Sequence, residues 1–255
     1  MNVLVCVKRV PATGGRIVLT PDEQEIDTKF LGFTVSPHEE CAVEEAVRIV
    51  ESLGGSSTVL TLGADVAEEQ LRDAMAIGAD RAIHLRTGGE EWDGRATAAA
   101  IVDAVGSEEA GGTAFDLLLF GNEAADTGGY QVGIRVAHAL GRPVVTGVKQ
   151  LEVGDGRAVA RREAGSGWEV FDVPLPAVMT VREGINLPRY PSMPGRLKAK
   201  RKPVDQGRPG SPENGLRKQR LRLPQGQDKR VRVLGEGVAA VPAAVEVLRD
   251  IGVVG

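Results

Sequence analysis

Short apolar runs alternate with segments of helical periodicity through the first 147 residues. Each run is apolar at consecutive positions, which is typical of a parallel strand that is buried on both faces. In the segments that follow, apolar residues recur every three or four positions, and this spacing predicts helices that pack on the sheet. The predicted strands are residues 3–7, 57–62, 82–85, 115–120 and one that begins at 144; the predicted helices are residues 37–53, 66–77, 93–105 and one that contains Val132 and Val136.

The first predicted helix carries signals at both ends. Ser36 is suited to cap its N-terminus, Pro37 occupies the first helical position, and Glu39 at the third position completes a capping box. Gly54 and Gly55 predict its end. The polar stretch before it, residues 9–33, predicts a loop or a small hairpin.

The pattern changes at Gly147. Residues 148–153, 157–164 and 168–173 alternate apolar and polar positions, and two short Gly-containing turns separate them, which predicts an antiparallel meander. A further apolar strand is predicted at 175–181. From about residue 186 to 232 the periodicity is lost, and a short amphipathic helix is predicted at 241–251.

These elements predict an α/β fold, in which a doubly wound, Rossmann-like parallel sheet carries an antiparallel meander and an extended C-terminal arm. We expect residues 1–184, with the 148–173 meander, to form one domain and residues 185–255 to form the arm and terminal helix. Ligands of such sheets bind at the carboxyl ends of the strands, near a switch in strand order. The candidate ligand loops therefore follow Val7, Leu62 and Phe120.

The loop after Phe120 has the composition of an anion site. It contains Asp126, Thr127, Gly128 and Gly129 between a strand and a helix. Glycines let the backbone approach a ligand, and the first N–H groups of a helix are unpaired and favour negative charge. Asp126 or Thr127 is also suited to cap the helix. The alternative is an ordinary capped turn, because the loop matches neither GxGxxG nor a Walker motif.

Charge is distributed unevenly along the chain, whose net charge is −4. Residues 185–233 hold 14 Lys and Arg against 3 Asp and Glu, whereas the remainder carries a net charge of −15. This basic arm is either disordered or wraps a partner. Nucleic acid is one candidate, but the arm offers only Tyr190 for stacking and the acidic remainder repels phosphates. We therefore expect no nucleic-acid partner.

The sequence holds few groups for catalysis or for binding a metal. Cys6 and Cys41 are the only cysteines, and neither has a CxxC partner, so we expect no disulfide framework and no metal site. His84 and His138 are scattered and fit structural roles better than catalytic ones. No signal peptide and no membrane-spanning stretch is evident, which favours a cytoplasmic protein without membrane insertion. The chain is thus typical of a binding or carrier subunit rather than an enzyme.

Five segments resemble the β-subunit of electron transfer flavoprotein. They occur in the family's order from residue 2 to about residue 203. The segments are VLVCVKRVP at 3–11, SPHEECAVEEAVRI at 36–49, AMAIGADRAIHL at 74–85, LPAVMTV at 175–181 and PRYPSMPGRLKAKRKP at 188–203.

This resemblance implies a heterodimer whose α-subunit holds most of the redox FAD. The β-subunit of the family buries AMP or, in electron-bifurcating members, a second FAD. Electrons arrive from acyl-CoA or other flavin dehydrogenases and leave to a quinone oxidoreductase, and the flavin performs the chemistry. The arm of the family lies over the α-subunit. The segment at 188–203 looks more like the non-bifurcating type.

The resemblance also implies which residues meet the nucleotide and the dehydrogenase. His38 stands where the family often has a phenylalanine that faces the partner's flavin. The docking tip of the family falls on Ile185, beside Asn186 and Leu187. The implied cofactor-binding residues are Cys6, Ser36, Pro37, His38, Glu39, Leu62, Asp126, Thr127, Gly128, Gly129, Tyr130, Gln131, Val132, Gly133 and Ala137.

A rival function from a different class is a stand-alone adenine-nucleotide sensor like the universal stress proteins. It would use the same type of sheet, but a monomeric sensor has no evident use for a basic arm.

Overall fold

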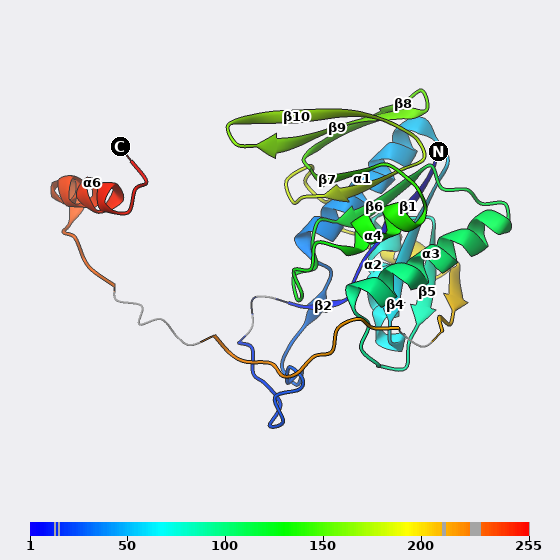
Figure 1. The fold of residues 1–255 in the computed structure, drawn as a ribbon, viewed down its shortest axis with the longest axis horizontal. Helices are drawn as coiled ribbons and strands as arrows, with labels where there is room; N and C mark the ends of the chain where they lie inside the picture. The colour runs from blue at the N-terminus through cyan, green and yellow to red at the C-terminus, as the bar shows by residue number, and fades with distance from the viewer. Residues whose placement is uncertain (13, 15, 211–212, 225–230, 255) are drawn as a thin grey trace.

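The computed structural model describes residues 1–254 except 13, 15, 211–212 and 225–230. Within these residues, seven parallel strands form one sheet in the order β12-β5-β4-β1-β6-β11-β7, which confirms the predicted doubly wound fold (Figure 1). The strands are β1 (Asn2–Cys6), β4 (Ser56–Gly63), β5 (Arg81–Arg86), β6 (Leu117–Gly121), β7 (Val144–Val148), β11 (Ala177–Val181) and β12 (Val204–Gly207).

Helices cover both faces of this sheet. The helices are α1 (Pro37–Leu53), α2 (Glu68–Ile77), α3 (Gly94–Ala110) and α4 (Val132–Ala139), and a short 3₁₀ turn, η1 (Asp65–Ala67), precedes α2. Alternate residues of β1 point to opposite faces: Val3 and Val5 pack in the cluster that includes α1 and α2, whereas Leu4 and Cys6 pack in the cluster that includes α3 and α4. The protein therefore has two apolar cores with the sheet between them.

The predicted signals at the ends of α1 are confirmed. The helix begins at Pro37 after the N-cap Ser36, whose N–H donates to Glu39 Oε2 at 3.2 Å. Gly54 ends it at a positive φ of 73°, a conformation that glycine adopts readily. The stretch before α1, predicted as a loop or a small hairpin, is mostly loop, and β2 (Val10–Pro11) pairs antiparallel with β3 (Phe33–Thr34) at its ends.

The predicted meander is a second, antiparallel sheet. It consists of β8 (Gln150–Gly154), β9 (Arg157–Ala164) and β10 (Gly167–Pro174). Ala158, Ala160 and Val173 from this sheet are buried in the same apolar cluster as α1. The meander therefore extends the core on the α1 face of the parallel sheet.

The loss of periodicity after residue 186 did not predict two elements that lie there. α5 (Met193–Ala199) packs against α2, and β12 adds a strand beside β5 at the edge of the sheet. Both elements are too short to produce a recognisable period: β12 has only four residues and gains its structure from pairing with β5. The domain boundary at residue 184 remains a prediction.

The C-terminal part of the arm leaves this body. The predicted terminal helix is present as α6 (Val241–Asp250), after a 3₁₀ turn η2 (Gly237–Ala240), and none of its residues is buried. Figure 1 shows α6 well separated from the sheet. Residues 225–230 of the predicted basic arm lie outside the described residues. Among the described residues, no helix has both the length and the apolar character needed to cross a lipid bilayer.

Two glycines allow the packing between helix and sheet to be tested. A Cβ at Gly133 would lie 2.9 Å from Thr180 Cγ2 and 3.2 Å from the Phe120 ring, whereas a Cβ at Gly106 in α3 would meet nothing within 4 Å. We predict that Gly133→Ala lowers the free energy of unfolding by about 1–3 kcal/mol through overpacking. Gly106→Ala should raise it by about 0.5–1 kcal/mol, because alanine favours the helix. Urea unfolding of the full chain measures the change in the free energy of unfolding for both variants. Equal changes in the two variants would contradict the close contact at Gly133.

Candidate functional site

The site lies where the order of strands switches. The chain passes from β1 through α1 to β4 on one side, and later returns to place β6 on the other side of β1. The loops after β1 and β6 therefore diverge over opposite faces of the sheet and leave a crevice at its carboxyl edge. Three contacts join the two sides: Lys8 Nζ to Asp126 Oδ2 (2.6 Å), Ser36 Oγ to the Glu123 carbonyl (3.2 Å) and His38 to Glu123.

Glu39 is buried between the residues after β1, the start of α1 and the end of β6. Its side chain is only 6% exposed, and its Oε2 accepts hydrogen bonds from the N–H groups of Lys8 (3.1 Å) and Ser36 (3.2 Å). A Cβ at position 121 would lie 2.6 Å from Glu39 Cγ, so Gly121 is needed where β6 ends. Burial raises the pKa of Glu39 to about 7, although the two backbone N–H groups oppose that shift.

The turn between β6 and α4 is longer than a simple capped turn. The predicted helix cap at Asp126 or Thr127 is wrong, because α4 begins at Val132 with Gln131 as its N-cap. Gly128 and Tyr130 both adopt positive φ, at 55° and 53°, and this backbone delays the start of the helix. Asp126 instead forms its ion pair with Lys8.

This turn presents backbone donors to the solvent. The Gly128 N–H donates to the Ala124 carbonyl at 2.9 Å and is therefore already used. The N–H groups of Gly129, Tyr130 and Gln131 donate to no acceptor among the described residues, and residues 125–130 are exposed. Three successive open donors at the end of this turn are suited to hold an anion.

His38 is held in one tautomer. Its Nδ1 accepts a hydrogen bond from the Glu183 N–H at 2.8 Å, so the neutral ring carries its proton on Nε2, which lies 3.3 Å from Glu123 Oε1. A hydrogen bond to the same carboxylate raises the pKa of Tyr130. Glu123 thus joins the imidazole and the phenol on one rim of the crevice.

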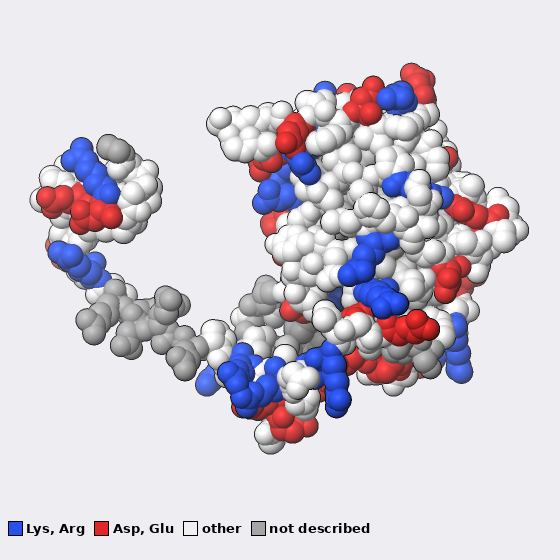
Figure 2. Space-filling view, viewed as in Figure 1, with Lys and Arg blue, Asp and Glu red and all other residues white. Residues whose placement is uncertain are grey.

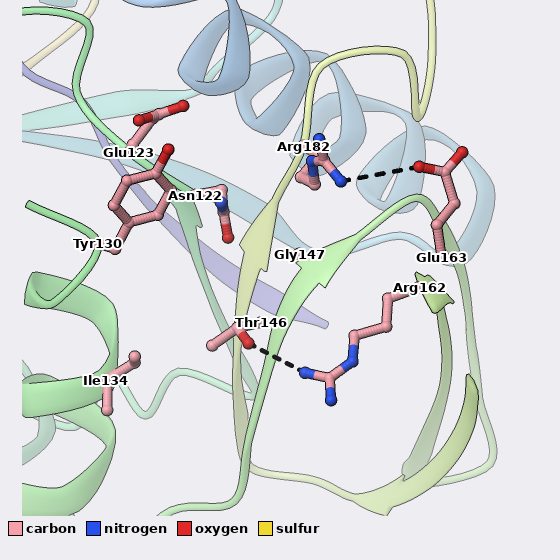
Figure 3. Close-up of a pocket in the computed structure, with 9 residues that line it drawn as sticks. All are labelled: Asn122, Glu123, Tyr130, Ile134, Thr146, Gly147, Arg162, Glu163 and Arg182. Atoms are coloured by element: carbon pink, nitrogen blue, oxygen red, sulfur yellow. Dashed lines mark hydrogen bonds and ion pairs between the residues drawn. The ribbon is translucent and has the colours of Figure 1, made fainter. Parts of the chain in front are cut away.

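A hollow of about 400 Å³ opens beside this rim (Figure 3). Figure 3 shows Tyr130 and Glu123 on one side of it and Arg162 and Arg182 on the other. Arg162 donates to Thr146 Oγ1 at 3.2 Å, and Arg182 pairs with Glu163 at 3.7 Å. The hollow is lined by Asn122, Glu123, Tyr130, Ile134, Thr146, Gly147, Arg162, Glu163 and Arg182.

Some of the predicted site residues face the core instead of the crevice. Ala137 is fully buried beside α3, so it can support a ligand only by packing. Cys6 is 7% exposed, and burial raises the pKa of its thiol far above its usual value, which excludes a reactive thiolate at neutral pH. Leu62 and Val132 are partly buried against the same cluster, and Gly133 is buried against Thr180. The remaining predicted residues lie at the start of α1 or in the turn between β6 and α4.

The loop after β11 is fixed to α1. Asn186 Nδ2 donates to the Cys41 carbonyl (3.0 Å) and to Glu45 Oε2 (2.9 Å), and Arg189 pairs with Glu44 and Glu51. Ile185 is half-buried and packs against the core, whereas Leu187 is 91% exposed. The docking role of this loop remains a prediction.

Two residues of the site were missed in the sequence. Lys8 lies two residues after Cys6, where β1 ends, and its position one step beyond the predicted strand 3–7 was the available signal. Glu123 carries no comparable signal, because its role depends on the meeting of the β6 turn with His38 from α1.

The buried Glu39 makes stability depend on pH. Its folded-state pKa of about 7 lies above the ordinary value of 4.5, so the folded protein binds the proton more tightly, and this contribution to stability is lost as pH rises from about 4.5 to about 7. Glu39→Gln has no such titration. We predict that the free energy of unfolding of this variant, relative to that of the wild type, rises by about 3 kcal/mol as the pH increases from 4.5 to 8. Urea unfolding at several pH values measures this difference, and parallel curves would contradict it.

The sequence is similar to that of known proteins. Residues 26–209 match the family model described as the electron transfer flavoprotein domain. The chain is 35% identical to "Electron transfer flavoprotein subunit beta" of Bacillus subtilis, over 81% of this chain and 78% of that protein. It is 34% identical to the protein of the same name from Syntrophomonas wolfei, over 92% of this chain and 91% of that protein.

A relative with a different name belongs to the same group. "Caffeyl-CoA reductase-Etf complex subunit CarD" of Acetobacterium woodii is 33% identical, over 80% of this chain and 77% of that protein. The family model covers α1, strands β4 to β12 and the turn between β6 and α4. The chain therefore belongs to the electron transfer flavoprotein beta-subunit family, whose role is electron transfer.

Proposed function

We propose that this chain is the β-subunit of a heterodimeric electron carrier and holds an adenine nucleotide in the crevice between β1 and β6. Its α-subunit partner supplies most of the site for the redox FAD. Electrons pass from acyl-CoA-type or other flavin dehydrogenases towards a quinone oxidoreductase. The observation that carries the proposal is the run of open N–H groups at residues 129–131, placed at the switch point of the sheet.

The charges of the crevice fit a phosphate only in part. Lys8 and the three N–H groups favour an anion, whereas Glu123 and Asp126 oppose one. Asp126 is compensated by its 2.6 Å pair with Lys8, and Glu123 directs its carboxylate at His38 and Tyr130. The phosphate is therefore held mainly by backbone donors, which is the usual role of a Gly-rich turn.

The site supports a carrier better than an enzyme. His38 is committed to Glu183 and Glu123, and His84 is buried in β5 with its Nε2 3.2 Å from the Gly63 carbonyl. Neither histidine faces the crevice as a free base. The flavin supplies the redox chemistry when it is bound, and this chain supplies the binding surface.

Two alternatives keep the same crevice but change its occupant or its context. A bifurcating carrier would hold a second FAD in place of AMP, and its isoalloxazine ring would need more room than AMP. A stand-alone adenine-nucleotide sensor would need no partner. The exposed helix α6, which has no buried residue, favours a chain that has a partner.

Co-expression with the α-subunit and extraction of the bound nucleotides tests the proposed function. We predict a yellow heterodimer that contains one FAD and one AMP. Two FAD would indicate the bifurcating carrier, and a colourless monomer would indicate the sensor. In the same assay, Gly128→Val should lower the AMP content, because valine is strained at a φ of 55° and would obstruct the approach of the phosphate.

A second variant at Gly128 separates the strain that valine imposes on the turn from its obstruction of the phosphate. Asparagine tolerates positive φ, so Gly128→Asn keeps the turn but adds a side chain. Loss of AMP with both variants indicates close approach of the ligand to Gly128, whereas loss with valine alone indicates strain of the turn. An unchanged AMP content in both variants would exclude this turn from the site.

The loop after β11 is proposed to dock the dehydrogenase through Leu187. Burial of this exposed side chain in a partner would contribute roughly 1.5–3 kcal/mol to the free energy of binding. We predict that Leu187→Ala raises the apparent KM for the carrier about ten- to a hundredfold, with the flavin spectrum unchanged. Ile185→Ala is the matched control, because Ile185 packs on the core and its truncation should mainly lower stability. If only Ile185→Ala alters the KM of folded protein, the anchor is Ile185.

A further inference from the structure

A segment of the arm, residues 213–224, crosses the carboxyl edge of the sheet, and we name it the strap (Figure 1). One end of it is fastened to the start of α3. Asp93 Oδ2 accepts hydrogen bonds from the N–H groups of Gly215 (2.7 Å) and Leu216 (2.9 Å). Asn214 accepts from the Asp93 N–H at 2.9 Å and donates to the Glu91 carbonyl at 2.7 Å.

The other end of the strap is fastened to the loop of residues 16–27, which lies between β2 and β3 in the connection from β1 to α1. The Leu221 N–H donates to the Glu23 carbonyl at 2.8 Å, and Gln24 Nε2 donates to the Gln219 carbonyl at 3.1 Å. Arg220 also lies 3.6 Å from Glu23 Oε2. Since α3 follows β5, the strap joins the loops that leave two different strands of the sheet.

Lys218 is the cation at the centre of this arrangement. Its Nζ lies 2.8 Å from Glu25 Oε1 and 2.5 Å from Glu91 Oε1, and its side chain is only 24% exposed. These carboxylates come from the two loops that the strap joins, and they would repel each other without the ammonium group. Figure 2 shows Lys and Arg side chains next to Asp and Glu where this part of the arm passes below the body.

The start of α3 connects the strap to the turn that is proposed to hold the phosphate. Asp93 caps α3 through the N–H groups of Arg95 and Ala96, and the next residue, Gly94, is in close contact with Gln131. A Cβ at Gly94 would lie 2.9 Å from Gln131 Cγ. A shift of the start of α3 therefore displaces the end of the phosphate turn.

We propose that the strap is a closure of the nucleotide site. Fastened by Lys218 and Asp93, it holds the 16–27 loop and the start of α3 together across the carboxyl edge of the sheet, and bound nucleotide leaves slowly. Released, it frees the start of α3 and the turn at residues 129–131, and nucleotide exchanges faster. The effect on nucleotide rests on the proposed function, whereas the effect on the turn does not.

Reversal of the central charge tests this closure. Lys218→Glu replaces two attractions with repulsion. Arg217→Glu is the matched control, because it makes the same charge change at the neighbouring, exposed position, which pairs with no carboxylate among the described residues. The triple variant Lys218→Glu with Glu25→Lys and Glu91→Lys restores the pairing with opposite signs. Each full chain is purified with its partner subunit or, where none binds, alone.

Two measurements follow the strap and the site separately. Hydrogen exchange reports on the amides of the strap and of residues 94–96 and 127–131. Timed gel filtration followed by nucleotide analysis measures how fast bound nucleotide is released. We expect Lys218→Glu to speed exchange of the strap and of the turn about tenfold, and to speed nucleotide release by a similar factor. Arg217→Glu should behave as the wild type, and the triple variant should recover most of the slow exchange.

The results that overturn the closure are distinct from those that overturn the nucleotide site. If exchange in the strap does not respond to Lys218→Glu, the strap is not fastened by this residue. If the strap responds and the turn does not, the strap is a tether and not a closure. Absence of nucleotide from the wild type would contradict the proposed function, and exchange at the turn would still decide whether the strap closes the crevice.

Discussion

The fold depends on the pairing of β1 with two neighbours at once. β1 hydrogen-bonds to β4 along one edge and to β6 along the other, and Val3, Leu4 and Val5 are completely buried between the two helical layers. Burial of each of these side chains contributes roughly 1.5–3 kcal/mol to the stability of the folded protein. Because β1 stands where the chain changes direction across the sheet, the same pairing creates the crevice between the loops that follow β1 and β6.

Polar groups within this crevice come at a cost in stability. Glu39 is buried at the end of α1, where two backbone N–H groups only partly compensate the loss of solvent. The same carboxylate satisfies the N–H groups of Lys8 and Ser36, which would otherwise be buried without partners. A residue that lowers stability at neutral pH thus holds together the loop after β1 and the start of α1.

The arm has two parts with different physical characters. Residues 193–210 and 213–224 make specific contacts with the body through α5, β12 and the strap, many of them between basic residues of the arm and acidic residues of the body. In contrast, α6 has no buried residue. The basic residues of the arm therefore pair with acidic residues of the same chain, whereas the apolar side chains Val241 and Leu248 of α6 remain exposed.

The sequence alone determined the elements whose signals are local. The period of the apolar residues located β1, β4, β5, β6 and the helices between them, and Ser36, Pro37 and Gly54 located the ends of α1. The alternation after Gly147 likewise predicted the meander. These features follow from backbone geometry and from burial on one or both faces, which a short window of sequence contains.

The tertiary structure decided everything that depends on two distant segments. β12 and α5 have no period of their own and form because β5 and α2 offer them an edge and a face. Ile185 is half-buried and Leu187 exposed because Asn186 and Arg189 fix the loop to α1. Lys8 meets Asp126, and Lys218 meets Glu25 and Glu91, only after the sheet has brought the loops of separate strands to one edge. A pattern within one segment cannot predict these pairings, because their energy arises from contacts between segments that lie far apart in the chain.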